Sequence, residues 1–325
     1  MKKVIYSDPF IPAEFIYAYG LKPSRIAPSQ NIAGSLDIRE GICPYISSFI
    51  SYIKSEDADA IIVTTLCDQM RRCSELIKNE TETPIFLFNL PSTWQTKTAL
   101  DIYTYELKRL GRFLLKIGGE EPTSDELTDI MKKFDNSRSI LRSLWNRISP
   151  RIYAKTILRF YEHGEPDFKI PTSPPDDKGI SLALIGGPLP ESELDLFDII
   201  EENDGKVILN GTENGERTFP APFDYNQIHL DPLRELVKAY FGSIPDVSRR
   251  PNTSLYDWLK REIYERGVRG IIVRYYTWCD LWHGEIQRLK ELCYRPVISI
   301  NADSVYPGVI ERTRTRIEAF IEQLK

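Results

Sequence analysis

The residues in this chain best able to do chemistry are its five cysteines, Cys43, Cys67, Cys73, Cys279 and Cys293. An odd number of cysteines in a chain that we expect to stay in the cytosol argues against a disulfide framework. It leaves metal binding, redox chemistry or simple burial. Thiolates are soft ligands that suit iron–sulfur clusters and Zn²⁺, and spacing alone does not name the metal. The position of each cysteine in the fold must therefore decide its role.

Two of the cysteines share a repeated local pattern. Cys67-Asp68 and Cys279-Asp280 each follow an apolar strand, precede a predicted helix and lead to a proline that opens another strand. The distance from cysteine to proline is 17 residues in both cases, from 67 to Pro84 and from 279 to Pro296. Matched elements on both sides of a matched dipeptide predict an internally duplicated chain with two similar α/β domains.

The apolar periodicity predicts strands joined by helices in each half. Continuous apolar runs such as Ile61-Ile62-Val63 are typical of parallel strands covered on both faces. The predicted strands are 4–7, 60–65, 84–88, 180–185, 206–209, 270–273 and 296–300, and the predicted helices outside the middle region are 12–20, 44–52, 68–78, 191–202 and 280–292. We expect an α/β fold with two similar Rossmann-like or flavodoxin-like domains and parallel sheets.

The middle of the chain has a different pattern. From about 98 to 161 the apolar residues recur at helical spacing, and Thr123 to Glu126 has the sequence of a helix start. Residues 166–178 are rich in Pro, Asp and Ser and have no periodicity, which indicates a linker or long surface loop. We therefore predict an N-terminal α/β domain with a helical extension over 1–165 and a C-terminal α/β domain over 166–325.

The predicted elements place three cysteines at helix starts. In a parallel sheet, ligands gather beyond the carboxyl ends of the strands, and Cys67 and Cys279 each follow a strand directly. Cys43 precedes Pro44, which fits the first position of a helix. We expect the exposed N–H groups and the dipole at these helix starts to favour a thiolate.

A single cysteine is more often a small buried hydrophobe than a ligand, and we keep that interpretation for Cys73 and Cys293, which fall inside predicted helices. For Cys43, Cys67 and Cys279 together, ligation is the better hypothesis.

Composition limits the other functions. The net charge of -5 leaves no broad basic face for nucleic acid, and no apolar run is long enough for a bilayer. The first residues break at Asp8-Pro9 instead of continuing as a signal-peptide core, so we expect a cytoplasmic protein. The sequence has no dinucleotide-binding, Walker-A or serine-hydrolase motif. Gly186-Gly187-Pro188 could bring backbone amides to an anion, but such a pair is more often only a turn.

Several segments along the chain together resemble one known family. They are Pro12-Ala13-Glu14, Ala18-Tyr19-Gly20-Leu21, the segments around Cys43, Cys67-Asp68 and Cys279-Asp280, Ile199-Ile200-Glu201 with Gly205, and the stretch from Arg314 to Glu322. With these segments the chain resembles the family that contains the cluster-bearing subunits of 2-hydroxyacyl-CoA dehydratases and ATP-dependent benzoyl-CoA reductases, as in the 2-hydroxyglutaryl-CoA dehydratase D-component. The resemblance spans nearly the whole chain, and the C-terminal helix is its most specific part.

The resemblance implies a [4Fe–4S] cluster held by Cys43, Cys67 and Cys279, with one iron position left for substrate, water or sulfide. It also implies a homologous second subunit in a heterodimer, or a homodimer, and a separate ATP-hydrolysing iron–sulfur activator. The implied enzyme is a lyase that eliminates water from a 2-hydroxyacyl-CoA through a ketyl radical formed after one-electron reduction. Because the β-proton of such a thioester is not acidic, a redox cofactor suits this reaction better than acid–base residues alone.

Other functions fit the same residues. The chain could be a non-catalytic electron-transfer subunit, or a related ATP-dependent acyl-CoA or benzoyl-CoA reductase. A double-cubane-type reductase would take more cysteine ligands than the five present. A metal-free binding protein would leave the three thiols in place by coincidence. Residues 211–217 resemble only loosely a family segment that often carries an aspartate and another cysteine, and no catalytic residue is assigned.

Overall fold

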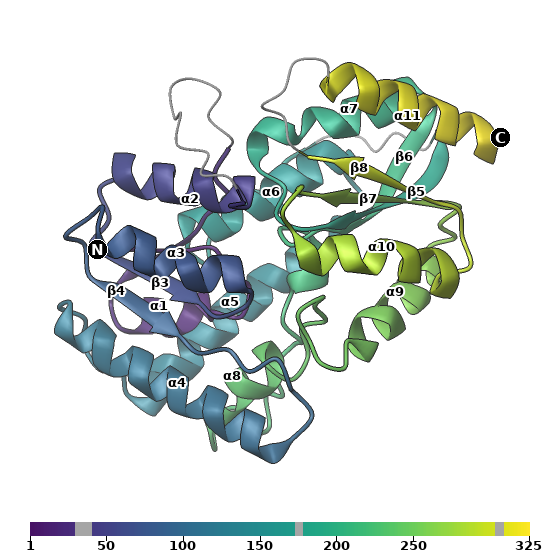
Figure 1. The fold of residues 1–325 in the computed structure, drawn as a ribbon. Helices are drawn as coiled ribbons and strands as arrows, with labels where there is room; N and C mark the ends of the chain where they lie inside the picture. Colours follow the sequence, from purple (N-terminus) through teal and green to yellow (C-terminus); the bar gives the residue numbers. More distant parts are fainter. Residues whose placement is uncertain (30–40, 173–177, 303–308) are drawn as a thin grey trace.

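The protein contains two parallel sheets that are built in the same way (Figure 1). The computed structural model describes residues 1–29, 41–172, 178–302 and 309–325. The first sheet has the order β2-β1-β3-β4 and the second the order β6-β5-β7-β8, and all strand pairs are parallel. The strands are β1 (Lys3–Tyr6), β2 (Lys22–Arg25), β3 (Ala60–Thr64), β4 (Ile85–Phe88), β5 (Ile180–Gly186), β6 (Gly205–Gly211), β7 (Gly270–Tyr275) and β8 (Val297–Asn301).

This arrangement confirms the predicted α/β fold with two similar domains. In each half, the first and third strands lie in the centre of the sheet and the second and fourth at its edges. The register of the two repeated units also corresponds, since Ile61 of β3 pairs with Ile85 of β4 and Ile271 of β7 pairs with Val297 of β8. The duplication inferred from the Cys-Asp spacing is thus a duplication of whole strand–helix–strand units.

Helices cover both faces of the first sheet. They are α1 (Ala13–Ala18), α2 (Pro44–Ser55), α3 (Asp68–Lys78) and α4 (Lys97–Lys116), and the helical middle region adds α5 (Ser124–Ser143) and α6 (Pro150–His163). Alternate residues of one strand point to opposite faces. Val4 and Tyr6 therefore pack with α1 and α4, whereas Ile5 packs with α2 and α3. Both faces of β1 and β3 are buried, which explains their continuous apolar runs.

The second sheet is covered in the same manner. Leu182 and Leu184 pack with α7 (Asp195–Glu202) and α11 (Val309–Leu324) on one face. On the other face, Ala183 and Ile185 pack with α9 (Thr253–Glu265) and α10 (Asp280–Leu292). The helix predicted over 191–202 is divided, because a short 3₁₀ turn (Glu191–Glu193) precedes α7.

One helix of the second half packs on the first. The helix α8 (Pro232–Tyr240) contacts α4 and α5, and its Leu236 and Tyr240 belong to the same buried cluster as β1 (Figure 1). The division of the chain at residue 165 stays a proposal. The helix α8 follows that residue in the sequence but packs on the domain that precedes it. Three elements were not predicted from the sequence, namely β2, α8 and α9. No helix in the described ranges has both the length and the apolar run needed to cross a bilayer.

The start of α5 is a capping box, as its sequence predicted. The Thr123 side chain accepts a hydrogen bond from the Glu126 backbone N–H at 3.2 Å, and the Glu126 carboxylate accepts one from the Thr123 N–H at 2.8 Å. We expect Thr123→Ala to lower the free energy of unfolding by about 1 kcal/mol, because an N–H at the helix start loses its partner. Urea denaturation would measure this difference, and an unchanged midpoint would contradict the stabilising role of the box.

Candidate metal centre

The carboxyl ends of the central strands form the candidate site. In an open parallel sheet with this strand order, ligands bind where the connections after the first and third strands diverge to opposite faces. In the first sheet that point lies after β1 and β3, and β3 leads directly to Cys67. In the second sheet it lies after β5 and β7, and the turn after β7 leads to Cys279. The two cysteines of the repeated pattern thus occupy equivalent places in the two sheets.

Each of the three predicted ligands is the residue that precedes the first turn of a helix. Cys43 is the N-cap of α2, with Pro44 at the first helical position, Cys67 is the N-cap of α3, and Cys279 is the N-cap of α10. The Cys67 sulfur accepts a hydrogen bond from the backbone N–H of Met70 at 3.3 Å. The predicted placement of these three cysteines at helix starts is confirmed.

The fold brings the three cysteines to one region. Cys43 belongs to the buried cluster between β1, β3 and α2, and both Cys67 and Cys279 pack against that cluster. Gln69, in the first turn of α3, connects the start of that helix at Cys67 to Cys43. Its side chain accepts a hydrogen bond from the Cys43 N–H at 3.3 Å and donates one to the Gly41 carbonyl at 3.1 Å. Cys43 interacts electrostatically with both Cys279 and Cys67. Thiols 236 residues apart in the sequence (279 − 43) are therefore neighbours.

The N–H groups at the helix starts favour the thiolates, as expected, but burial outweighs them in the metal-free protein. Burial raises the pKa of Cys43 and of Cys67 to about 12 and that of Cys279 to about 11. Backbone N–H groups lower these values, but removal from water is the larger effect. The three sulfurs are protonated at neutral pH, so a metal that binds them must displace protons, and its affinity must rise with pH.

The chemistry of the three sulfur donors can be compared with what a single metal ion and what an iron–sulfur cluster require. Within the described ranges, no three His, Cys, Asp or Glu side chains lie close enough together to hold one metal ion. In an iron–sulfur cluster each thiolate binds a different iron, so the sulfurs surround the cluster and do not meet at one point. Three soft sulfur donors in a largely apolar setting, each beside helix N–H groups, suit such a group.

The other two cysteines lie in the cores. Cys73 is fully buried on α3, and Cys293 is buried at the end of α10 in the core beside β7. Both environments match the predicted role of small hydrophobic residues.

The sequence interpretation missed a buried glutamate that interacts electrostatically with two of the cysteines. Glu213 follows β6, is only 9% exposed, and interacts electrostatically with Cys67 and Cys279. Its carboxylate takes part in no hydrogen bond or ion pair with any described residue. Two signals could have found it: its position just after a predicted strand, and its place in the segment that only loosely resembles the family pattern.

Charged side chains from both sheets surround Glu213. Asp8 follows β1 and accepts hydrogen bonds from Thr64 and from the Phe10 N–H. Asp246 forms a buried ion pair with Arg217 at 2.6 Å. Arg25 of β2 donates to the Glu213 carbonyl at 2.5 Å. Acidic and basic groups from distant parts of the chain are thus buried together where the two sheets meet.

The Glu213 carboxyl should make stability depend on pH. Burial, with Asp246 as a further cause, raises its pKa to about 8, while Arg25 and Arg217 lower it. The folded chain therefore keeps a proton that the unfolded chain releases near its ordinary pKa of 4.5, so folding becomes less favourable as pH rises from about 4.5 to about 8. We expect Glu213→Gln to remove this loss, with a relative gain at pH 8 of a few kcal/mol at about 1.4 kcal/mol per pKa unit.

Urea denaturation of the metal-free protein between pH 5 and pH 8.5 would test this expectation. Asp8, whose burial raises its pKa to about 6, gives the same sign in both proteins, so the difference between them isolates Glu213. Parallel pH dependences for the two proteins would contradict the expectation.

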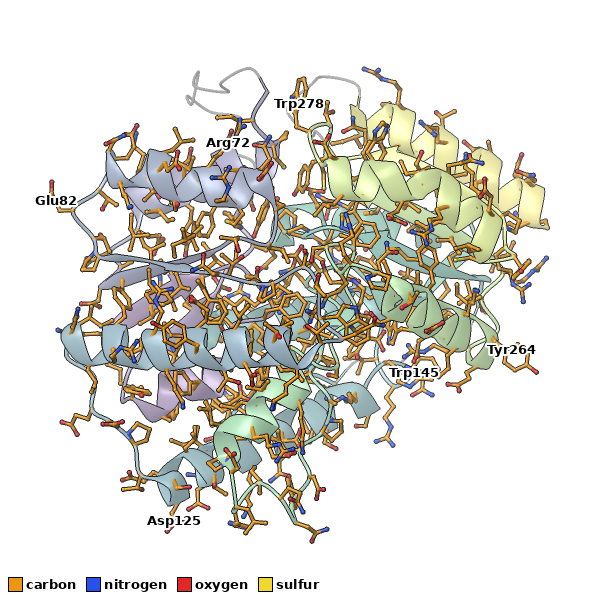
Figure 2. All side chains as sticks on the ribbon, turned by 60° about the horizontal axis from the view of Figure 1, so that its bottom comes forward. Arg72, Glu82, Asp125, Trp145, Tyr264 and Trp278 are labelled. Carbon is orange, nitrogen blue, oxygen red and sulfur yellow. The ribbon has the colours of Figure 1, made fainter. Side chains whose placement is uncertain are left out.

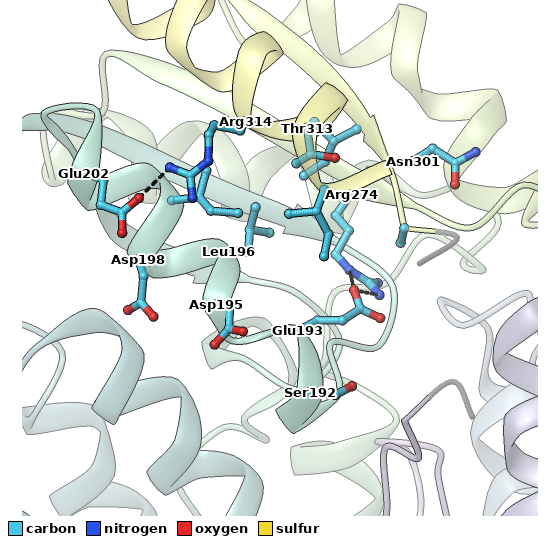
Figure 3. Close-up of a pocket in the computed structure, with 14 residues that line it drawn as sticks. Ser192, Glu193, Asp195, Leu196, Asp198, Glu202, Arg274, Asn301, Thr313 and Arg314 are labelled. Atoms are coloured by element: carbon cyan, nitrogen blue, oxygen red, sulfur yellow. Dashed lines mark hydrogen bonds and ion pairs between the residues drawn. The ribbon is translucent and has the colours of Figure 1, made fainter. Parts of the chain in front are cut away.

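A pocket of about 440 Å³ lies beside the site, between α7, the ends of β7 and β8, and α11 (Figure 3). Arg274 at its inner wall binds Glu193 and donates to the Tyr276 hydroxyl at 2.9 Å, and the Tyr276 ring packs near Tyr45. Tyr276 also interacts electrostatically with Cys43. The charged residues of its lining are Glu193, Asp195, Asp198, Glu202, Arg274 and Arg314. Because carboxylates outnumber guanidinium groups there, the pocket disfavours polyanionic ligands.

The surface beside the site carries an exposed aromatic residue. Trp278 directly precedes Cys279 and is 45% exposed at the turn between β7 and α10 (Figure 2). The turn that presents Cys279 is therefore close to solvent, while the sulfur itself is mostly enclosed.

Fold and site together define the class: α/β proteins with two duplicated parallel-sheet units and cysteines at helix starts between them. The chain belongs to the 2-hydroxyglutaryl-CoA dehydratase, D-component family, whose sequence model matches residues 9–324. It is therefore a subunit of the 2-hydroxyacyl-CoA dehydratase type, and the resemblance described from the sequence is confirmed.

Other comparisons add little. No curated protein matches the chain. The distantly similar solved structures include the following three. The laminin-binding protein Lbp of Streptococcus pyogenes is 14% identical over 100% of both chains, with a TM-score of 0.24. The laminin-binding protein Lmb of Streptococcus agalactiae is 12% identical over 100% of both chains, with a TM-score of 0.25. The protein FpvC from Pseudomonas aeruginosa, solved with Mn²⁺, is 10% identical over 100% of this chain and 98% of its own, with a TM-score of 0.24. Likeness at this level supports no inference.

Proposed function

We propose that this chain is the iron–sulfur subunit of a 2-hydroxyacyl-CoA dehydratase-type enzyme, which eliminates water from a 2-hydroxyacyl-CoA after one-electron reduction. The observation that carries the proposal is the convergence of Cys43, Cys67 and Cys279. They come from both halves of a duplicated chain, and each stands at a helix start beyond the carboxyl edge of a sheet.

The chain's own residues would hold and shield a [4Fe–4S] cluster. Cys43, Cys67 and Cys279 supply the thiolates, and N–H groups such as that of Met70 stabilise the negative charge on sulfur. Tyr45 and Tyr276 cover the apolar side of the site and limit access of water. When bound, the cluster would supply low-potential one-electron chemistry, which acid–base side chains do not provide.

The proposal includes partners. A homologous second subunit, or a second copy of this chain, would complete the enzyme, and an ATP-dependent iron–sulfur activator would deliver the electron. The family, which is described as one component of a dehydratase, supports a partner subunit. The activator rests on the sequence resemblance alone. Within the described residues the pocket beside Tyr276 is unsuited to the phosphates of coenzyme A, so we place the acyl-CoA thioester on the cysteine side of Tyr276.

The first experiment is strictly anaerobic reconstitution of the chain with iron and sulfide. We expect about four irons per chain, with an electron paramagnetic resonance signal after dithionite reduction. Titration with an acyl-CoA would then distinguish a catalytic subunit from an electron-relaying one, since only the former should change the signal. A chain that takes up no iron would refute the proposal.

A further inference from the structure

We propose that Arg25 is a positioning residue of the cysteine site. By joining the two sheets at their carboxyl edges, it fixes where Cys279 of the second half lies relative to the cysteines of the first half. Its consequence for iron binding rests on the proposed function. The positioning itself concerns the metal-free chain and can be tested there.

The Arg25 guanidinium makes hydrogen bonds to both halves of the chain. Arg25 is the buried last residue of β2, and its Nε donates to the Ser7 carbonyl, just after β1, at 3.2 Å. The two terminal nitrogens donate to the second half, Nη2 to the Glu213 carbonyl at 2.5 Å and Nη1 to the Thr218 hydroxyl at 3.4 Å. A guanidinium is planar and carries its donors in a fixed fork. One rigid group therefore bridges the edge of the first sheet and the connection that follows β6.

The first end of this bridge is bonded to the helix that begins at Cys43. Ile26, which follows Arg25, donates its N–H to the Tyr6 carbonyl at 2.8 Å. The Ile26 carbonyl accepts from the Tyr45 hydroxyl at 3.2 Å. Tyr45 lies in the first turn of α2, two residues after Cys43. The strand end that carries Arg25 and the helix start that carries Cys43 thus hold each other in place.

The second end of the bridge is bonded, step by step, to Cys279. The Glu213 N–H donates to the Gly187 carbonyl at 3.2 Å, and the carbonyl of the next residue accepts from Arg274 of β7 at 2.6 Å. Arg274 also donates to the Tyr276 hydroxyl at 2.9 Å. The Tyr276 carbonyl in turn accepts from the Cys279 N–H at 3.0 Å. Hydrogen bonds therefore connect the loops after β5, β6 and β7 to the turn that presents Cys279.

The bridge supplies direction, which the apolar contact between the halves does not. Tyr45 and Tyr276 meet across the site with their ring centroids 6.0 Å apart, and an apolar contact of this kind is not directional. The acceptors of Arg25 are carbonyl and hydroxyl oxygens that are fixed in the main chain or beside it. Ligands of one metal group must be held in one geometry. Arg25 is therefore placed to fix the separation of the two halves.

Cross-linking of the metal-free chain with dibromobimane, a reagent that joins two neighbouring thiols, tests this role. The parent chain carries Cys73→Ala and Cys293→Ala, so that only the three thiols of the site remain. Peptide mass spectrometry would separate links within the first half from links to Cys279. In Arg25→Met we expect the ratio of links to Cys279 over links within the first half to fall roughly tenfold. The loss of about one charge-assisted hydrogen bond changes an equilibrium by this factor.

The link between Cys43 and Cys67 is the internal reference. Gln69 connects these two residues within the first half, so Arg25→Met should leave their link unchanged. A general loss of stability would alter both kinds of link together. An unchanged ratio in Arg25→Met would overturn the positioning role, as would a parent chain that forms no link to Cys279.

Ser24→Ala serves as the matched control. Ser24 is the buried neighbour of Arg25 on β2, and its hydroxyl donates to the Glu162 carbonyl of α6 at 2.9 Å, which does not reach the second sheet. Its ratio should equal that of the parent chain. Circular dichroism would establish that each variant is folded. If Arg25→Met does not fold, Thr218→Val removes one acceptor of Arg25 and should lower the ratio in the same direction, and an unchanged ratio there would overturn the role.

Anaerobic reconstitution with iron separates this inference from the proposed function. We expect about four irons in the wild-type chain and clearly fewer in Arg25→Met, whereas Ser24→Ala should match the wild type. Full iron content in Arg25→Met would overturn the positioning role alone. A wild-type chain without iron would overturn the proposed function, and the cross-linking ratio would still decide where Arg25 holds Cys279.

Discussion

Replacing Cys67 with alanine should remove most of the bound iron and leave the chain folded. Cys67 is the N-cap of α3, and like Cys279 it packs against the buried cluster that contains Cys43. A cluster with two remaining thiolates loses iron readily, because each missing ligand exposes an iron to solvent. The sheets and their helices form the main cores, so we expect the metal-free variant to lose only about 1 kcal/mol of unfolding free energy.

Cys73→Ala provides the matched control for this prediction. Cys73 lies on the same helix and is fully buried in the same apolar cluster, but it stands within the helix and not at its start. Its removal should cost a similar amount of stability and leave the iron content unchanged. Iron and sulfide analysis of both variants after identical anaerobic reconstitution would decide the matter. Equal iron in the two variants would show that Cys67 is not a ligand.

The largest loss of stability should come from breaking the buried ion pair between Glu14 and Arg138. Both side chains are fully buried, with 2.9 Å between the Arg138 Nη2 and a Glu14 carboxylate oxygen. The Tyr240 hydroxyl donates to the other carboxylate oxygen at 2.5 Å, so the pair connects α1, α5 and α8. Glu14→Ala leaves a buried guanidinium with the Tyr240 hydroxyl at 3.4 Å and the Asp135 carboxylate at 3.8 Å, and we expect a loss of about 3–5 kcal/mol.

Two comparisons make this prediction specific. Glu202→Ala breaks the exposed pair with Arg314 and should change the stability little, because solvent screens exposed charges. The double variant Glu14→Leu with Arg138→Met should recover much of the loss, since apolar side chains of similar size often replace a buried pair at little cost. Urea denaturation of the metal-free proteins would measure all three. Similar losses for Glu14→Ala and Glu202→Ala would contradict the importance of the buried pair.

Much of the site followed from local sequence. The order of strand, Cys-Asp, helix and proline-led strand recurs with one spacing, and helix starts depend on residues that are neighbours in the chain. Cys43, Cys67 and Cys279 could therefore be placed at helix starts from the sequence alone. The capping box at Thr123 could also be predicted from the sequence, because its two partners are three residues apart.

Edge strands and the elements in long connections were harder to predict from the sequence. The strand β2 has the sequence Lys-Pro-Ser-Arg, which contains no apolar run, and it forms only because β1 offers it an edge to pair with. Pro23 is tolerated there because an edge strand leaves one side free of ladder hydrogen bonds. The packing of α8 on α4 across the proposed boundary also depends on the assembled cores and not on any local signal.

The sequence by itself determined which cysteines stand at helix starts and which family the chain resembles, because both depend on short-range patterns. Only the tertiary structure decided how the thiols ionise and which other groups join them. Burial outweighs the helix N–H groups and keeps the sulfurs protonated, and burial also raises the pKa of Glu213, which interacts electrostatically with Cys67 and Cys279. Desolvation and electrostatic interaction depend on distance in space, and the fold sets those distances between residues that are far apart in the chain.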